Sequence, residues 1–441
     1  MSARTAKGFG AALAALVLIA ATPAEPESRL QQYFRLRGEA GEAAKAGDLA
    51  TAEARLEAAL ALYPTSPGSL IRLARVEAAA GKPAEAVAHL ATYAELDLTF
   101  GVAGDPALKA LADRPDFAPV AVRLAKNAQA VGAVEPIAVL EPAGAIFEGI
   151  VRHGDGWLVS SVAGRTILTV SPDGAAKPFL TPDAETGGLF GMAVDARKGV
   201  LWVAEARGPG IPGSTGAART GLIQVSLKDG RVLARYLVPA DGDRKHQLGD
   251  VALGEDGAVY ASDSVGATIY RLAPGSLKLE PFVTSREMAS PQGMAVCPGA
   301  DALVVADYST GLHRIDLRTG SETSLGGKWT VALAGTDGLF ITPYSFAVRN
   351  AWPHPVAVIA TQNGVSPQRV MFLRLSPDCR ELEDAFVLAA NHAALDDPTL
   401  GAPAPGGIVV IGSSGWAGYD GDGKPVAGAP TTAKLLSIPL P

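Results

Sequence analysis

Oxygen-bearing side chains at matching positions of a repeated pattern have the chemistry to hold a metal ion. The pattern is a variable residue, usually followed by Gly, at the start of an apolar run, and it recurs six times after about residue 140. The variable residues are Glu148, Phe190, Gly249, Gln292, Asp337 and Leu400. Carboxylate and amide oxygens suit Ca²⁺ and other hard cations, and a carboxylate can also take a proton from water. If these positions converge, Glu148, Gln292 and Asp337 form a divalent-metal site, with Ca²⁺ the expected ion and Asp337 also the general base.

The spacing of the pattern predicts the fold that would bring these residues together. Successive copies are 42 to 63 residues apart, and several short apolar runs fall between them. A quasi-period above about forty residues, with several strands in each unit, is typical of a β-propeller whose blades stack around an axis. We expect an all-β six-bladed β-propeller over residues 137–441, with the residue before each Gly facing the central channel. Strands at 137–142 and 434–440 are expected to pair and close the ring.

Several other polar residues fall near the predicted rim of the channel, and the sequence does not rank them. These rim candidates are Asp250, His246, Asn363, Asp397 and Thr399, with Gln362, Arg369, Asp396 and Tyr344 as further members. Asp263 and Asp307 sit at matching places in neighbouring blades and are expected to tie blade turns together. The alternative for the whole set is structural, because Asp and Gln beside a Gly also satisfy backbone donors in tight turns.

The pattern resembles the senescence-marker-protein and gluconolactonase family of six-bladed propellers. The matching residues are Glu148 in FEGIV, Gln292 in SPQGMAV and Asp337 in GTDGLF. The resemblance implies that these residues bind a divalent metal at the channel mouth and that Asp337 acts as general base for lactone opening. The sequence departs from the family pattern at two positions, because Gly249 and Gln292 stand where the family has Asn.

The segment before the propeller carries a second repeat. Two matching turns, AGDLATAEA and AGKPAEAVA, place Gly47 and Gly81 34 residues apart. This is the period of tetratricopeptide repeats, which the segment resembles. We expect an all-α tetratricopeptide-like domain over residues 28–127 and a linker over 128–136. The repeats either bind a protein or peptide partner or form a small module packed against the propeller.

Charge and cysteine content exclude some classes of protein. The net charge of −7 gives no basic stripe that could neutralise nucleic-acid phosphates. The two cysteines, Cys297 and Cys379, fall in different predicted blades. We therefore expect two buried free thiols, with a disulfide as the less favoured alternative.

The first residues read as an export signal. Arg4 and Lys7 precede a short apolar run, and small residues at 22–24 offer a cleavage site. We expect a signal peptide over residues 1–24, with an uncleaved anchor as the alternative. No later apolar run is long enough to span a bilayer, so we expect a periplasmic or secreted protein without a membrane span after cleavage.

Two functions are compatible with this sequence. The first is an exported metal-binding hydrolase that opens a lactone or similar cyclic ester in the propeller channel. The alternative is a non-catalytic scaffold or sensor that binds a small molecule in the channel or a protein at the helical repeats. The sequence contains no Gly-x-Ser-x-Gly elbow, dinucleotide fingerprint or P-loop.

Overall fold

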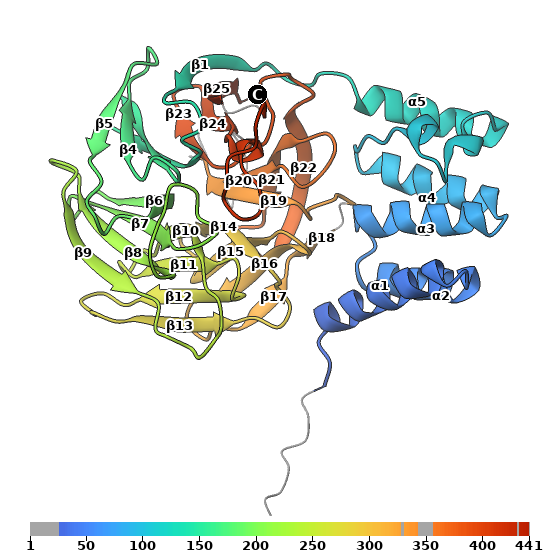
Figure 1. Ribbon diagram of the computed structural model, residues 1–441, viewed down its shortest axis with the longest axis horizontal. Coiled ribbons are helices and arrows are strands. Elements are labelled where there is room, and N and C mark those ends of the chain that lie inside the picture. The colour runs from blue at the N-terminus through green and yellow to red at the C-terminus, as the bar shows by residue number, and fades with distance from the viewer. Residues whose placement is uncertain (1–25, 328–329, 343–355, 430–431, 441) are drawn as a thin grey trace, which may run out of the picture.

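The computed structural model describes residues 26–327, 330–342, 356–429 and 432–440. The expected signal peptide and Tyr344 lie outside these described residues. Two parts are visible, a helical domain and a ring of sheets (Figure 1). Among the described residues, no helix is long and apolar enough to cross a membrane.

The helical domain follows the tetratricopeptide plan that the sequence predicts. Its elements are α1 (Arg29–Lys45), α2 (Leu49–Leu62), α3 (Pro67–Ala79), α4 (Pro83–Glu95), η1 (Val102–Gly104), η2 (Lys109–Leu111), η3 (Pro115–Phe117) and α5 (Ala118–Asn127). Gly47 and Gly81 adopt φ of 79° and 77° in equivalent turns, a conformation that glycine takes without strain. Ser28 caps α1 through a reciprocal pair of hydrogen bonds with Gln31. Local signals therefore mark the start of α1 and the turns that follow α1 and α3.

The rest of the chain forms six sheets arranged as the blades of a propeller, as predicted. From the innermost strand outward, blade one consists of β2 (Phe147–His153), β3 (Gly156–Ser161), β4 (Ile167–Val170) and β5 (Ala176–Leu180), and blade two of β6 (Gly188–Asp195), β7 (Val200–Arg207), β8 (Arg219–Ser226) and β9 (Val232–Leu237). Blade three consists of β10 (Leu248–Leu253), β11 (Val259–Asp263), β12 (Thr268–Leu272) and β13 (Leu279–Thr284), and blade four of β14 (Pro291–Val296), β15 (Ala302–Asp307), β16 (Gly311–Asp316) and β17 (Glu322–Ser324). Blade five consists of β19 (Thr336–Ile341), β20 (Val356–Gln362), β21 (Arg369–Leu375) and β22 (Glu381–Ala390), with β18 (Gly326–Gly327) at its outer edge, and blade six of β23 (Gly401–Ala404), β24 (Gly407–Ser413), β25 (Ala433–Pro439) and β1 (Glu135–Leu140).

The ring closes through strands from the two ends of this segment. β1 pairs antiparallel with β25, and Glu135 lies opposite Ser437. The strand that follows the helical domain therefore supplies the outermost strand of blade six, as the sequence predicts. The innermost strands contact one another around the whole ring, from β2 through β23 and back to β2.

The repeated glycine has a packing reason. A side chain at Gly149 would collide with the carbonyl oxygen of Phe190 on the next blade, and one at Gly338 would collide with that of Thr399. A β-bulge interrupts the innermost strand at the same place in blades one to five. Bulges redirect side chains and bend the strand. The glycine and the bulge together let neighbouring blades approach closely while the preceding residue turns to the channel mouth.

One prediction about the core is wrong, because Cys297 and Cys379 form a disulfide. Cys297 follows β14 in blade four, and Cys379 lies in the turn between β21 and β22 in blade five. These blades are neighbours in the ring, and both cysteines are buried in one apolar cluster with a Cα–Cα distance of 6.5 Å. That spacing is compatible with a disulfide. The prediction of free thiols fails because adjacent blades share one apolar core, so residues of different blades can be in contact.

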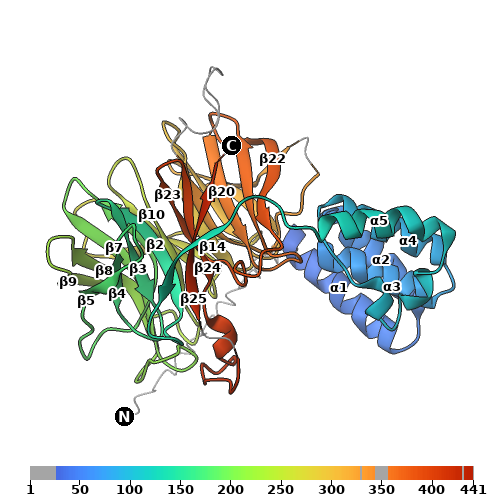
Figure 2. The same cartoon turned by 90° about the horizontal axis from the view of Figure 1, so that it is seen from above.

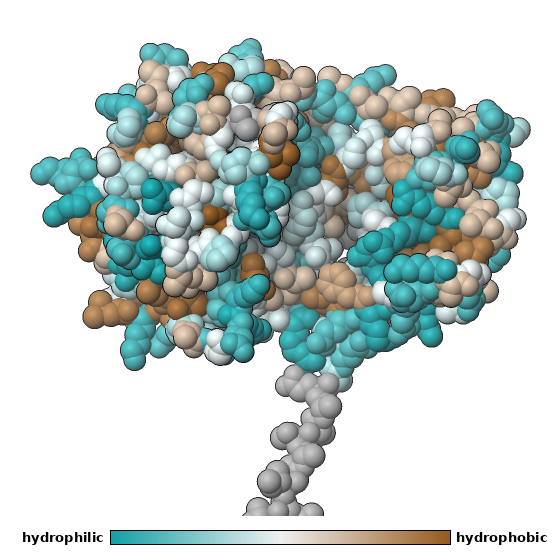
Figure 3. Space-filling model, in the orientation of Figure 1, coloured by the Kyte–Doolittle hydropathy of each residue, from teal (hydrophilic) through white to brown (hydrophobic). Residues whose placement is uncertain are grey.

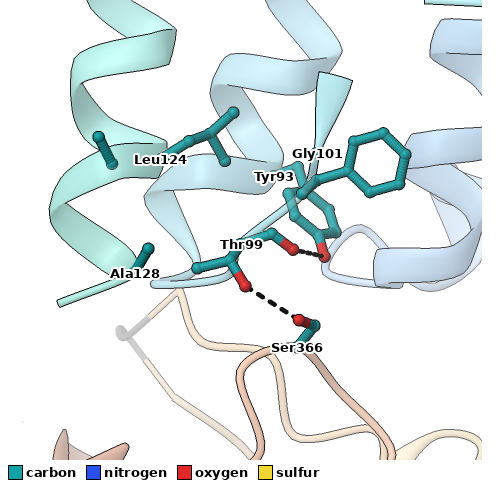
Figure 4. A pocket seen from close by; sticks show the side chains of 8 residues that line it. Tyr93, Thr99, Gly101, Leu124, Ala128 and Ser366 are labelled. Carbon is teal, nitrogen blue, oxygen red and sulfur yellow. Dashed lines mark hydrogen bonds between the residues drawn. The ribbon is translucent and has the colours of Figure 1, made fainter. Parts of the chain in front are cut away.

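The helical domain packs beside blades four and five (Figures 1 and 2). The helical domain contacts propeller loops at the rim where the innermost strands of the blades begin. Ser28 donates to the Arg286 carbonyl at 2.6 Å, and the backbone N–H of Thr99 donates to the Ser366 carbonyl at 2.7 Å. The Thr99 and Ser366 hydroxyls also lie 2.9 Å apart, beside a cavity lined by both domains (Figure 4). The helical domain therefore borders the same rim as the predicted site.

Candidate metal and catalytic site

The predicted metal ligands share one cavity at the channel mouth. The cavity has a volume of about 190 Å³, and its polar walls include Glu148, Asp250, Gln292 and Asp337. Phe190, Leu400 and Trp416 supply apolar walls. Five of the six variable positions of the pattern contribute a side chain here, and the sixth is Gly249. The structure thus brings together residues from all six innermost strands or the segments just before them.

Glu148 is half-buried, and one of its carboxylate oxygens accepts a hydrogen bond from the indole N–H of Trp416. Burial raises the pKa of the Glu148 carboxyl well above its usual range, and the nearby charge of Asp337 raises it further. The Trp416 N–H opposes this shift, because a hydrogen bond to the charged form stabilises that form. Glu148 is therefore oriented by an aromatic donor and sensitive to the charge of a second carboxylate.

Asp337 is held by an amide from the neighbouring loop. The Nδ2 of Asn363 donates to an Asp337 oxygen at 2.6 Å, and the Tyr308 hydroxyl donates to the Asn363 amide oxygen at 3.1 Å. This chain fixes which way the amide faces. Burial and the charge of Asp397 raise the pKa of Asp337 to about 7. A carboxyl with this pKa is well matched to general-base work near neutral pH.

Asp250 takes the place that Gly occupies in other copies of the pattern. One of its oxygens accepts from the backbone N–H of Met294 at 2.9 Å, across the gap between blades three and four. Its side chain fills the space beside Gly191, where a Cβ would collide with it. Burial raises the pKa of Asp250 to about 7. Asp250 is thus a member of the cavity wall that also links two blades.

Gln292 presents its amide oxygen to the cavity. Its Nε2 donates to the Ser290 hydroxyl at 2.8 Å, which orients the amide. A Cβ on Gly249 would lie 3.8 Å from the Gln292 amide oxygen, so this oxygen occupies the space beside Gly249. The two departures from the family pattern therefore adjoin each other in space.

Some of the remaining rim candidates support the residues of the site, and others lie away from it. The Asp397 carboxylate accepts from the Ser414 hydroxyl and acts on Asp337 through its charge. Thr399 is buried and donates to the backbone carbonyl of Glu148 at 3.3 Å. His246 lines a different cavity of about 670 Å³, and its Nδ1 lies 2.6 Å from Asp263. Of the five, Asp250 lines the site cavity, and Asn363 reaches the site through its hydrogen bond to Asp337.

The expected structural role of Asp263 and Asp307 is confirmed. Asp263 accepts backbone N–H groups from Gln247 at 2.9 Å and Gly266 at 2.8 Å. Asp307 accepts the N–H groups of Ala289 and Ser290 in the loop that leads into β14. Both side chains tie the loop before an innermost strand to the second strand of the same blade.

Trp416 is the site residue that sequence reasoning missed. It belongs to η5 (Trp416–Gly418), in the connection between β24 and β25. Connections after the second strand of a blade lie on the rim where innermost strands begin, so blade topology points to this loop. The repeated pattern does not, because Trp416 is outside it.

The donor set fits a hard divalent cation. The carboxyl groups of Glu148, Asp250 and Asp337 line one cavity together with the Gln292 amide, and the charge of Asp337 makes ionisation of Glu148 unfavourable. A bound cation would relieve that repulsion. Within the described ranges, no three His, Cys, Asp or Glu side chains form a metal cluster by themselves. Gln292 and water would therefore have to complete the six to eight oxygens that Ca²⁺ takes.

The raised carboxyl pKa values predict an unusual pH dependence of stability. A carboxyl whose pKa is higher in the folded than in the unfolded chain stabilises the fold below its unfolded pKa, and this contribution is lost as pH rises through about 7. Without divalent cations, the free energy of unfolding of Asp337→Asn relative to that of the wild type should rise between pH 4 and pH 8. Urea denaturation at several pH values measures this difference. A difference that is flat or falls with pH would contradict the assignment.

The chain is similar to a known family in part of its helical domain and to solved structures over about 70% of its length. Residues 43–99 match the family model for the tetratricopeptide repeat. No curated protein matches the sequence. Solved structures similar to the chain include a gluconolactonase from Xanthomonas campestris, with 17% identity, a TM-score of 0.44, and coverage of 71% of this chain and 97% of that one.

Two further solved structures are similar to the same extent. The calcium-binding protein regucalcin from Agrobacterium tumefaciens has 14% identity, a TM-score of 0.46, and coverage of 70% of this chain and 95% of that one. The PQQ-bound aldose sugar dehydrogenase from Streptomyces coelicolor has 17% identity, a TM-score of 0.44, and coverage of 70% and 99%. Similarities of this size assign no activity to the chain. What the comparisons do identify is a tetratricopeptide segment, residues 43–99, in front of the six-bladed propeller.

Proposed function

We propose that this chain is an exported, divalent-metal-dependent hydrolase that opens a lactone or similar cyclic ester at the mouth of its propeller channel. The observation that supports this most directly is the pair of carboxyl groups, Glu148 and Asp337, in one cavity. Each has a raised pKa, and each is oriented by a donor from a separate loop. Carboxylates with perturbed pKa values in a concave site are typical of catalytic groups.

The reaction assigns distinct roles to the residues of the cavity. Asp337 takes a proton from a water molecule as the water oxygen attacks the lactone carbonyl carbon. The ring C–O bond then breaks, and the same proton passes to the departing alkoxide, which leaves a hydroxy acid. Asn363 keeps the Asp337 carboxylate oriented throughout, and Trp416 does the same for Glu148. Glu148, Gln292 and Asp337 would hold the cation, which would polarise the carbonyl and stabilise the charge on its oxygen.

Metal binding and lactone hydrolysis can be tested together. The purified protein is stripped with chelator and titrated with Ca²⁺, Mg²⁺ and Zn²⁺ by calorimetry, and hydrolysis of five- and six-membered lactones is followed with and without metal. We expect binding of one divalent cation and activity that requires it. If neither binding nor hydrolysis is observed, the hydrolase proposal is wrong.

A second candidate is the non-catalytic scaffold. It is favoured by the tetratricopeptide match over residues 43–99, since such repeats commonly bind peptides. On this alternative the carboxyl cavity would bind a ligand without turning it over. A cation that binds without any lactone hydrolysis would favour the scaffold.

The disulfide supports the export part of the proposal. Disulfides persist in oxidising compartments such as the periplasm and are rare in reducing ones. Cys297 and Cys379 are both buried and joined. Protease protection of the protein in intact cells, and its release with the periplasmic fraction, would test the location.

A further inference from the structure

A second cavity lies between the two domains, next to the candidate site. It has a volume of about 500 Å³ and is formed by α3, Arg37 of α1 and the loop 363–366 between β20 and β21. Hydrophilic side chains gather on the helical domain where it faces the propeller (Figure 3). A cavity of this size is within the range of small-molecule sites.

Three arginines line this cavity, and only one of them is neutralised. Arg75 pairs with Asp105 at 2.7 Å. Neither Arg37 nor Arg72 has an acidic partner within ion-pair distance among the residues that the structure describes. Desolvation of its guanidinium lowers the pKa of Arg72, and the charges of Arg37 and Arg75 lower it further. The cavity therefore has a net positive charge that an anion would offset.

Arg37 also has unused hydrogen-bonding capacity. Its guanidinium lies over the ring of Tyr33, with 5.1 Å between the Arg37 Cζ and the ring centroid. Its Nε is buried and has no hydrogen-bond partner among the described residues. Buried donors without partners are uncommon in folded proteins and often mark a place that a ligand or water completes. A carboxylate or phosphate oxygen is a strong acceptor for such a donor.

Beside the arginines, the cavity wall has an apolar part and the polar side chains of Asn363 and Ser366. Ile71, Tyr93 and Phe100 come from the helical domain, and Val365 comes from the propeller loop. The same loop begins with Asn363, whose side chain also donates to Asp337. An occupant of the cavity would thus contact both the arginines and the loop that orients the proposed base.

We propose that this cavity, formed by Arg37, Arg72, Arg75 and the 363–366 loop, is a binding site for a small organic anion that carries a carboxylate or phosphate on an apolar body. The anionic group lies against Arg37 and Arg72, and the apolar body lies against Phe100 and Val365. The assignment is independent of the proposed hydrolase activity, because it rests on groups that do not line the carboxyl cavity.

The test uses calorimetric titration of the full chain with phenyl phosphate, benzoate and inorganic phosphate. We expect phenyl phosphate or benzoate to bind more tightly than inorganic phosphate, because the apolar wall adds contact. Which of the two aromatic anions binds better identifies the anionic group. Arg72→Gln should weaken binding about tenfold, the usual effect of losing one charged hydrogen bond. The double variant Arg37→Gln/Arg72→Gln should abolish it.

Arg55→Gln is the matched control. Arg55 is a half-exposed arginine of α2 that pairs with Glu39 at 2.9 Å and does not line the cavity. Its substitution should leave anion binding unchanged. Because Arg72 is exposed, Arg72→Gln should fold even if the Arg37 change disturbs packing on Tyr33. The proposal is overturned if none of the anions binds the wild type, if inorganic phosphate binds as tightly as both aromatic anions, or if Arg72→Gln binds them as the wild type does.

Discussion

Replacing Asp337 with Asn is expected to reduce lactone hydrolysis by about a hundredfold to ten-thousandfold, the usual contribution of a positioned general base. The amide cannot take the proton from water, although it fills the same space. The hydrogen bond with Asn363 could re-form through the amide oxygen of the new side chain, so the local geometry should survive. The measurement is kcat/KM on the best lactone at saturating divalent cation.

The same exchange at Asp396 controls for loss of a rim carboxylate. Asp396 is exposed, immediately precedes Asp397 and does not line the carboxyl cavity. Asp396→Asn should keep kcat/KM within about twofold of the wild type, an effect below 0.5 kcal/mol. Full activity in Asp337→Asn would refute the role of Asp337, whereas loss of activity only in Asp396→Asn would place the base elsewhere on the rim.

Replacing Arg369 with Met is expected to cost about 3–5 kcal/mol of stability, since several buried hydrogen bonds to a charged group are lost. Arg369 is fully buried in β21 and donates to the Gln362 side chain at 2.7 Å and to the Ala332 carbonyl at 3.2 Å. It also donates to the carbonyls of Leu96 and Asp97, at 3.1 and 3.2 Å, at the end of α4. Burial lowers the pKa of Arg369 to about 10, so the group stays charged at neutral pH.

These bonds make Arg369 a buried polar link between the propeller and the helical domain, in addition to the contacts of Ser28 and Thr99. In Arg369→Met, the helix-end carbonyls would be buried without donors or would separate from the propeller. Urea denaturation measures the loss of stability, and limited proteolysis of the segment 128–134, between α5 and β1, reports separation of the domains. Arg374→Met in the same strand is the control, because Arg374 is partly exposed and its ion pairs of 3.5 and 3.6 Å should contribute less than about 1 kcal/mol. Equal losses in the two variants would contradict this role.

The periodic features of the chain could be predicted from sequence because each has a local physical cause. Gly47 and Gly81 mark turns that need a positive φ. The glycine after Glu148 is required because the next blade leaves no room for a Cβ. Such constraints keep glycine at equivalent positions of each repeat. The spacing of these glycines therefore predicts both domains and the convergence of Glu148, Gln292 and Asp337.

Contacts between non-repeated segments could not be predicted in the same way. Trp416 reaches Glu148 from a loop that carries no copy of the pattern. Cys297 and Cys379 pair because the turn after the innermost strand of blade four meets a turn of blade five, a contact that assignment to blades does not predict. Arg369 could be placed near a rim, but its partners Leu96 and Asp97 belong to the other domain. Sequence periodicity therefore predicts the propeller ring but not the contacts between non-repeated segments that support the site and the domain interface.

The pairing of β1 with β25 has a consequence for how the protein is made. During synthesis, β1 leaves the ribosome early, directly after the helical domain. Its partner β25 emerges only when nearly all the remaining blades have been synthesised. Until then the nascent chain holds an unpaired strand and blade six lacks its third strand. Premature termination before residue 433 would thus leave an open ring with exposed sheet edges, the type of species that aggregates or is degraded.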